Sequence, residues 1–201
     1  MTGSPSQRRG RPAAPPAILD PVFALIERID RRRRGIRALR PGGVLGIEVR
    51  RHRGREVTLR DGSRVRPGDR IVDLHLDNTR VADLWAAGWR VAFGTAQADL
   101  RACAAWLVSL PPAARPVALR SGGLLTAGAA RVGFEVGPPR GGFMGALEGW
   151  YLRGLLVRWS RAGRARLDRG HVALRPREAW LSAAGLLARY GPEVSPARRA
   201  G

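Results

Sequence analysis

The sequence predicts an α+β protein in which a small antiparallel meander is flanked by helices and a C-terminal α/β half packs on it. Three observations lead to this fold class. Apolar residues recur at helical spacing near both ends of the chain, apolar and polar residues alternate between residues 43 and 76, and Gly and Pro pairs separate the alternating runs. Spacings of three and four residues indicate a buried helix face, whereas alternation indicates a strand with one buried face.

The N-terminal region is predicted to contain a tail and a helix. Residues 1–16 are rich in Pro, Gly and Arg, which is typical of a disordered basic tail. Residues 17–195 are predicted to form one domain, and residues 196–201 a frayed end. Asp20-Pro21 starts the helix, because a capping side chain precedes proline at the first helical position. The basic run 31–34 ends it, where cations suit the negative end of the helix dipole.

Four strands joined by turns are predicted next. Leu45, Ile47 and Val49 alternate with polar residues and indicate the first strand, which is half-buried. Asp61-Gly62 indicates a tight hairpin. The other three strands are expected at residues 56–59, as the return partner of the first, at 63–66 and at 70–76.

The rest of the chain is predicted to alternate helices with short strands. Thr95 is the expected cap of a helix that ends before Pro111-Pro112. Helices are predicted at 78–88, 95–110, within 124–132, at 143–159 and at 180–190, and strands at 89–94, 116–120, 133–136 and 171–176. The Pro- and Arg-rich stretch near 111–116 is a candidate boundary between two halves of one compact unit.

The composition is dominated by positive charge. The net charge is +20, and all 36 basic residues are Arg because the chain has no Lys. A GC-rich coding bias explains part of this excess, but the charge favours polyanions such as nucleic acid, anionic lipid headgroups or acidic glycans. The lack of Lys excludes phosphate-binding and Schiff-base lysines. Cys103 is the only cysteine, so an internal disulfide is excluded, and it is expected to be a buried core residue.

Polar residues gather at the end of the predicted strand 70–76. Asp73, His75 and Asp77 share one face of a regular strand, about 6.5 to 7 Å apart, where carboxylates can orient a His or hold a divalent metal. These are the candidate catalytic residues. The structural alternative is favoured, because Asp77 and Asn78 stand where a helix begins and can cap it. No metal ion or other cofactor is predicted.

The densest basic patch consists of Arg31, Arg32, Arg33 and Arg34. Between Arg28 and Arg70 there are fifteen Arg and five acidic residues, so an anion-binding surface is predicted there, together with Asn78. This stretch has no aromatic residue, which limits nucleic-acid binding to nonspecific phosphate contact. Contact with a membrane surface competes, because the predicted helix 143–159 combines Trp and Tyr with Arg. An aromatic core stripe with solvated arginines is the favoured interpretation of that helix.

Several functional signatures are missing. No apolar run is long enough to span a membrane, and no signal-peptide pattern is visible. The motifs G-x-S-x-G, H-E-x-x-H and G-x-G-x-x-G do not occur. The sequence therefore favours a protein that is not an enzyme, located in the cytoplasm and able to lie against the inner face of the membrane.

The run "LRDGSRVRPGDRIVDLHLDN" resembles the pattern of bacterial YkoP-like domains. A leucine and an Asp-Gly turn lead to a Gly-Asp pair and then to a strand end with the pattern Leu-His-Leu-x-Asn. The matching residues are Leu59, Asp61, Gly62, Gly68, Asp69, Leu74, His75, Leu76 and Asn78. The closing run "REAWLSAAGLLARYG" resembles the C-terminal helix region of these domains, and "RVGFEV" resembles their middle. The resemblance covers the chain from about residue 20 onward.

YkoP-like domains occur alone or attached to polysaccharide deacetylase domains, so the resemblance implies a role in cell-envelope glycan metabolism. The chain has neither the Asp-Asp-Gly metal motif nor the paired-His motif of such deacetylases, and their activity is not carried over. We expect an accessory, non-catalytic protein that binds a lipid surface, a glycan intermediate or a pathway protein. The alternatives are a metal-assisted hydrolase centred on His75, Asp73 and Asp77, and nonspecific nucleic-acid binding.

Overall fold

The computed structural model describes most of the chain between residues 29 and 192. The described residues are 29, 32–77, 80, 81, 84, 87–123, 126–159 and 176–192. The predicted N-terminal tail, most of the helix after Asp20, all but the last residue of the strand at 171–176 and the C-terminal end at 196–201 lie outside them.

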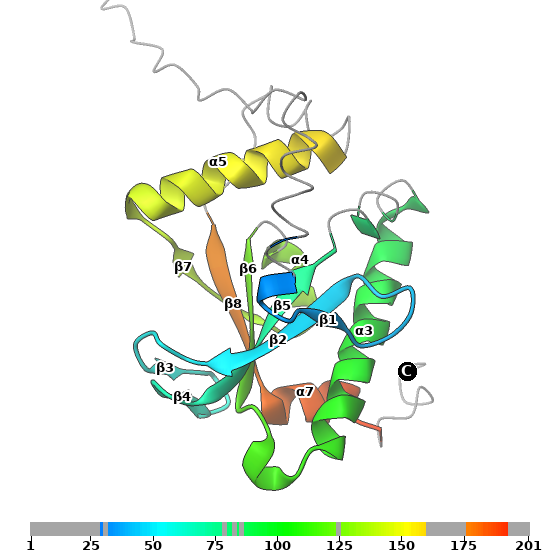
Figure 1. Ribbon diagram of the computed structural model, residues 1–201, viewed down its shortest axis with the longest axis vertical. Coiled ribbons are helices and arrows are strands. Elements are labelled where there is room, and N and C mark those ends of the chain that lie inside the picture. The colour runs from blue at the N-terminus through cyan, green and yellow to red at the C-terminus, as the bar shows by residue number, and fades with distance from the viewer. Residues whose placement is uncertain are drawn as a thin grey trace, which may run out of the picture.

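The described residues form two sheets and several helices (Figure 1). The larger sheet has six strands in the order β1-β2-β5-β6-β8-β7, and β3 and β4 form a separate hairpin. The strands are β1 (Arg37–Ala38), β2 (Leu45–Arg51), β3 (Val57–Thr58), β4 (Arg64–Val65), β5 (Arg70–Leu76), β6 (Ala118–Gly123), β7 (Glu135–Pro139) and β8 (Arg177–Ser182). The helices are α3 (Trp89–Ser109), α4 (Thr126–Arg131), α5 (Gly142–Trp159), α7 (Ala183–Tyr190) and the short 3-10 helix η2 (Pro112–Ala114). The predicted α+β class is confirmed.

The central sheet joins the two halves of the chain. β2 and β5 are antiparallel along their whole length, from Leu45 opposite Leu76 to Arg51 opposite Arg70. β5 then pairs in parallel with β6, which lies beyond η2. The two predicted halves therefore contribute strands to one sheet instead of packing on each other as separate layers.

The predicted pairing of the strand at residues 56–59 was wrong. β3 is not the return partner of β2, because it pairs only with β4, while β2 pairs with β1 and β5. The chain leaves the large sheet at His52 and returns at Asp69, where the backbone N–H of His52 donates to the Asp69 carbonyl at 2.7 Å. The β3–β4 hairpin is thus an excursion between two strands that are neighbours in the sheet.

The strand predicted at residues 89–94 was also wrong, because these residues form the first turns of α3. Thr95 lies inside the helix, and its hydroxyl donates to the Val91 carbonyl at 2.9 Å instead of capping an N-terminus. Phe93 packs against the main core, so tertiary packing overrides the strand preference of Val and Phe. Leu100 and Leu107 are buried on the same helix.

The C-terminal helix begins later than predicted. Trp180 and Leu181 belong to β8, which pairs with β6 on one side and β7 on the other. Ser182 caps α7, and its hydroxyl accepts a hydrogen bond from the Gly185 N–H at 2.8 Å. β6 pairs with all three residues of 180–182 and β7 also pairs with Trp180, so the sheet provides partners for backbone groups that a helix start would leave unpaired.

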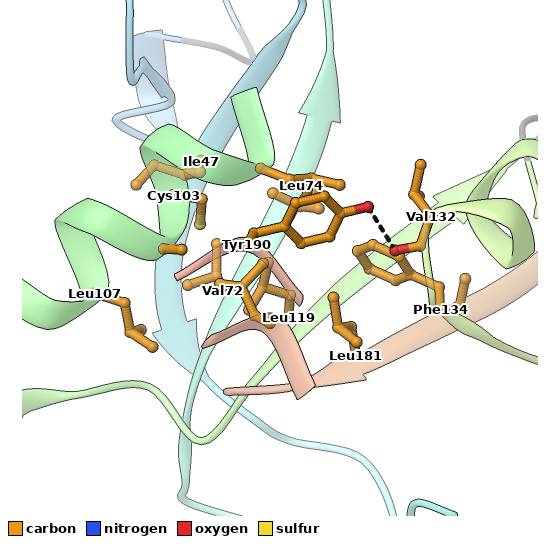
Figure 2. Packing of buried hydrophobic residues seen from close by; sticks show 14 residues of the cluster. Ile47, Val72, Leu74, Cys103, Leu107, Leu119, Val132, Phe134, Leu181 and Tyr190 are labelled. Atoms are coloured by element: carbon orange, nitrogen blue, oxygen red, sulfur yellow. Dashed lines mark hydrogen bonds between the residues drawn. The ribbon is translucent and has the colours of Figure 1, made fainter. Parts of the chain in front are cut away.

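The main core lies between one face of the sheet and the helices α3 and α7 (Figures 1 and 2). Its sheet residues include Ile47, Val72, Leu74, Leu119 and Leu181. Figure 2 shows the Tyr190 hydroxyl of α7 donating to the Val132 carbonyl, at 3.0 Å. A smaller cluster on the other face packs beneath the β3–β4 hairpin and consists of Leu59, Val65, Ile71, Ala118 and Trp180. Burial of each large apolar side chain contributes about 1.5–3 kcal/mol.

A buried carboxylate on α3 fixes the start of β2. Asp99 is 1% exposed and accepts the backbone N–H groups of Val44 and Leu45 at 2.7 and 2.9 Å. Its other oxygen lies 2.5 Å from Nε of Arg40. A Cβ atom on Gly43 would lie 2.6 Å from this carboxylate, so glycine is required for the close approach. No local sequence pattern indicates this contact.

We expect Asp99→Ala to lower the free energy of unfolding by about 3 kcal/mol, because two buried N–H groups and a guanidinium lose their partner. Urea denaturation followed by circular dichroism measures the change. The matched control is Glu56→Ala, whose carboxylate is exposed and 3.8 Å from its nearest arginine nitrogens, and which should change stability by less than about 0.5 kcal/mol. Equal stability of the two variants would contradict the structural role of Asp99.

Candidate functional site

The predicted polar residues lie on the sheet face that is turned away from α3 and α7. Asp73 and His75 alternate with Val72 and Leu74 of the main core, so they point to the opposite side. The register places Glu48 of β2, Asp73 of β5 and Arg120 of β6 side by side across the sheet. This face is therefore polar at the centre of the sheet.

Asp73 is held by two arginines from the neighbouring strands. Arg120 donates from Nε to one carboxylate oxygen at 2.6 Å and from Nη2 to the other at 2.7 Å. Nε of Arg50 lies 2.5 Å from Oδ2 of the same group. The Asp73 side chain is only 7% exposed, which weakens screening by water. Two guanidiniums thus occupy both carboxylate oxygens.

The ion pairs continue from Arg120 toward the far edge of the sheet. Nη1 of Arg120 lies 3.4 Å from Oε1 of Glu178 on β8. Arg140, between β7 and α5, donates to the same oxygen and also to Glu148 of α5 at 3.3 Å. The hydrogen bonds and the opposite charges of Glu178 and Glu148 raise the pKa of Arg140, against the effect of its burial. The Arg120 guanidinium also lies 5.9 Å from the centre of the Trp180 ring.

His75 pairs with Glu48 on the adjacent strand. Nε2 of His75 lies 3.0 Å from Oε2 of Glu48, and the two side chains are 23% and 14% exposed. Nη1 of Arg34 lies 3.9 Å from the same oxygen. Burial lowers the pKa of His75 below its usual 6.5, although the hydrogen bond to Glu48 acts in the opposite direction. Because a carboxylate oxygen can only accept a hydrogen bond, Nε2 of His75 carries the proton in this contact with Glu48.

Glu48, Asp73 and His75 together have the spacing of a cation site. One ligand atom from each lies within 4.8 Å of the others. An oxygen, oxygen and nitrogen donor set suits a divalent transition metal. The surrounding charges do not suit a cation, because Arg50 and Arg120 already bind Asp73 and Arg34 lies near Glu48. At the effective dielectric of a protein surface, each unit of like charge at about 4 Å repels by roughly 4 kcal/mol. The residues fit an ion-paired cluster better than a metal site.

Asp77 has a different position from Asp73 and His75. It follows the end of β5, and its Oδ1 accepts the Arg80 N–H at 3.2 Å while its carbonyl accepts the Val81 N–H at 2.9 Å. These are the contacts of a helix start. Among the described residues, the group with cation-site spacing contains Glu48 in place of Asp77.

The predicted anion-binding residues are described only in part. Arg32, Arg33 and Arg34 are exposed, and Arg34 approaches Glu48 as stated above. Asn78 and Arg31 lie outside the described residues.

Glu48 and Arg120 were not predicted as site residues from the sequence. The alternation of β2 places Glu48 on the polar face. Knowing the register of β2 with β5 would therefore have identified Glu48 as a neighbour of Asp73.

The residues of the resemblance that precede β5 shape the β3–β4 hairpin and the turn after it. Leu59 is buried beneath it, and Gly62 and Gly68 adopt φ of 82° and 95°, which other residues rarely adopt. Asp61 accepts the hydroxyl of Ser182 and the N–H of Ser63, and the Ser182 bond is the main cause that lowers the pKa of Asp61. Most of the motif therefore shapes a turn and a hairpin.

Cys103 carries no reactive chemistry. It is 1% exposed in the main core, and burial raises the pKa of its thiol to about 12. A thiol with this pKa is protonated at neutral pH and is a poor nucleophile. The predicted core role of Cys103 agrees with this position.

Comparison with known proteins gives one family. A family model described as YkoP domain matches residues 17–190. Neither the curated proteins nor the solved structures gave a match. In the described part of the chain, no helix has both the length and the apolar character needed to cross a membrane.

We expect acid to destabilise the wild type more than a His75→Gln variant. Because the folded-state pKa of His75 is depressed, the unfolded chain binds a proton more readily, and stability falls as the pH drops below about 6.5. The difference is at most about 1.4 kcal/mol per pH unit. Urea denaturation of both proteins at pH 7.5, 6.5 and 5.5 measures this difference in stability. The two proteins share all their other titratable groups, so the contributions of those groups cancel. Wild-type stability rising relative to the variant in acid would show that the Glu48 pair outweighs burial.

Proposed function

We propose that this chain, which belongs to the YkoP domain family, is an accessory, non-catalytic protein of bacterial cell-envelope polysaccharide metabolism that binds an anionic partner through an arginine-rich surface. The observation that carries the proposal is that Asp73 is already paired with arginines. Arg120 and Arg50 occupy both of its oxygens, so the most buried carboxylate of the polar face is engaged in the fold. A general base or metal ligand needs an oxygen that is free to approach substrate or ion.

The charge of the chain supports an anionic partner. Within the described residues, the central carboxylates are already matched by arginines, whereas Arg32 and Arg33 are exposed. Guanidinium groups bind phosphate and carboxylate oxygens with two parallel hydrogen bonds. The partners that fit are an anionic lipid surface, a phosphate- or carboxylate-bearing glycan intermediate, or an acidic protein of the same pathway. This role places the chain in the cytoplasm, against the inner face of the membrane.

Binding to such a partner should depend steeply on salt. We expect the affinity of the full chain for an acidic polysaccharide or for anionic vesicles to fall at least tenfold between 50 and 200 mM salt, roughly as for proteins that contact several phosphates. Fluorescence anisotropy and vesicle sedimentation measure this. A neutral polysaccharide and neutral vesicles are the controls. Salt-independent binding, or equal binding to the neutral partners, would refute the proposal.

A second candidate is a metal-assisted hydrolase centred on His75. The spacing of Glu48, Asp73 and His75 favours it, since a bound divalent ion would lower the pKa of its water and supply a nucleophile. In that function Glu48 takes the place of Asp77. Asp73 would first have to release the bidentate Arg120, which the surrounding positive charge opposes.

Zinc binding separates the two candidates. We expect the purified wild type to carry no stoichiometric zinc by elemental analysis, because both oxygens of Asp73 are occupied. Arg120→Met frees one side of Asp73 and should bind zinc more tightly than the wild type in calorimetric titration, whereas His75→Ala in the same background should not. One zinc per wild-type chain, lost in His75→Ala with the circular dichroism unchanged, would instead support the hydrolase.

A further inference from the structure

A second basic surface lies on the excursion between β2 and β5. We call residues 51–70 the hairpin lobe. It consists of the excursion, whose β3 and β4 project from the large sheet in Figure 1, together with Arg51 at the end of β2 and Arg70 at the start of β5. The lobe has three acidic residues and seven arginines, and all seven arginines are exposed. They are Arg51, Arg53, Arg55, Arg60, Arg64, Arg66 and Arg70.

The acidic residues of the lobe are already engaged. Glu56 lies 3.8 Å from both Arg64 and Arg66, and Asp61 accepts bonds from Ser182 and Ser63. Asp69 accepts the backbone N–H of Arg66 at 2.6 Å. Outside the lobe, Glu135 pairs with Arg60.

Four arginines of the lobe keep an unbalanced charge. In the part of the chain that the structure describes, no carboxylate lies within ion-pair distance of Arg51, Arg53, Arg55 or Arg70. Arg51 and Arg70 stand directly opposite each other on β2 and β5, an arrangement that costs stability for like charges. An external anion would remove this repulsion.

The lobe holds these charges on a fixed support. His52 is 4% exposed and packs edge-on against Trp180, with ring centres 5.4 Å apart. Arg51 donates to the Gly68 carbonyl at 2.9 Å, and Ser182 binds Asp61 at the hairpin turn. The arginines are therefore presented with little loss of backbone freedom on binding.

We propose that the hairpin lobe docks on an anionic phospholipid surface. Single-stranded nucleic acid is bound through an exposed aromatic platform beside the charges, whereas Trp180, which packs beneath the lobe, is only 4% exposed. Headgroups require only positive charge near the bilayer, and each arginine there raises the binding constant roughly fivefold. The inference rests on the proposed function in needing an anionic partner, but it names the lipid and assigns the contact to different residues from Arg31–Arg34.

Sedimentation of the full chain with vesicles of phosphatidylcholine, with and without phosphatidylglycerol, tests the inference. Three variants remove the same charge, each by three Arg→Gln changes. The lobe variant changes Arg53, Arg55 and Arg70, the N-terminal variant changes Arg32, Arg33 and Arg34, and the control variant changes the exposed Arg101, Arg131 and Arg177. We expect the lobe variant to bind anionic vesicles roughly 100-fold more weakly than the wild type, and the other two to lose less than about tenfold.

Each other outcome overturns the inference in a different way. Equal losses in all three variants would mean that only net charge matters. A loss confined to the N-terminal variant would support the proposed function and refute the lobe as the contact. Wild-type binding to an acidic polysaccharide or to duplex DNA, without binding to anionic vesicles, would refute the lipid and leave the proposed function standing. Urea denaturation confirms that each variant is folded.

Discussion

The ion pairs of Asp73 are the interaction on which the rest of the sheet depends. This carboxylate lies on β5 and is held by Arg50 from β2 and Arg120 from β6, so it ties together three strands, one of which comes from the second half of the chain. Each charge would be costly to bury alone, and removal of one partner from such a pair typically costs 3–5 kcal/mol. Ion pairs hold the strands together on this face of the sheet, as apolar packing does on the other face.

The two faces of the sheet consequently differ in what they can do. One face is a continuous apolar core under α3 and α7. In the described part of the chain, the other face has an apolar cluster beneath the hairpin, where Ile71 and Trp180 lie, and an ionic cluster from Asp73 onward. The ionic part is linked by pairs that run from Asp73 through Arg120 to Glu178 and Arg140. A polar face that is already paired suits support and recognition better than proton transfer.

Local patterns predicted the strands with one buried face but not their partners. Alternation identified β2 and β5, and turn residues identified the hairpin between β3 and β4. The register of β2 with β5 is set by tertiary contacts across an eighteen-residue excursion, and so Glu48 was not placed beside His75. Arg120 was missed for the same reason, because it comes to Asp73 only through a parallel pairing.

Errors of element type have a related cause. The first residues of α3 and the last residues of β8 were assigned from short apolar runs, for which strand and helix are ambiguous. Contacts distant in sequence decide between them: Phe93 packs on the main core, and Trp180 lies between β6 and β7. The long-range contact of Asp99 with the start of β2 was invisible to the same patterns.

The parallel pairing of β5 with β6 also has a consequence for synthesis of the chain. The centre of the sheet cannot form until β6 has been synthesised, because Ile71 pairs with Ala118 and Asp73 with Arg120. At 5–20 residues per second, this interval lasts roughly 2–10 seconds on the ribosome. During that time β5 has an open edge with apolar residues on one side, which is the kind of edge that invites pairing with another chain. The nascent protein is therefore most exposed to aggregation, and to capture by chaperones, just before its second half emerges.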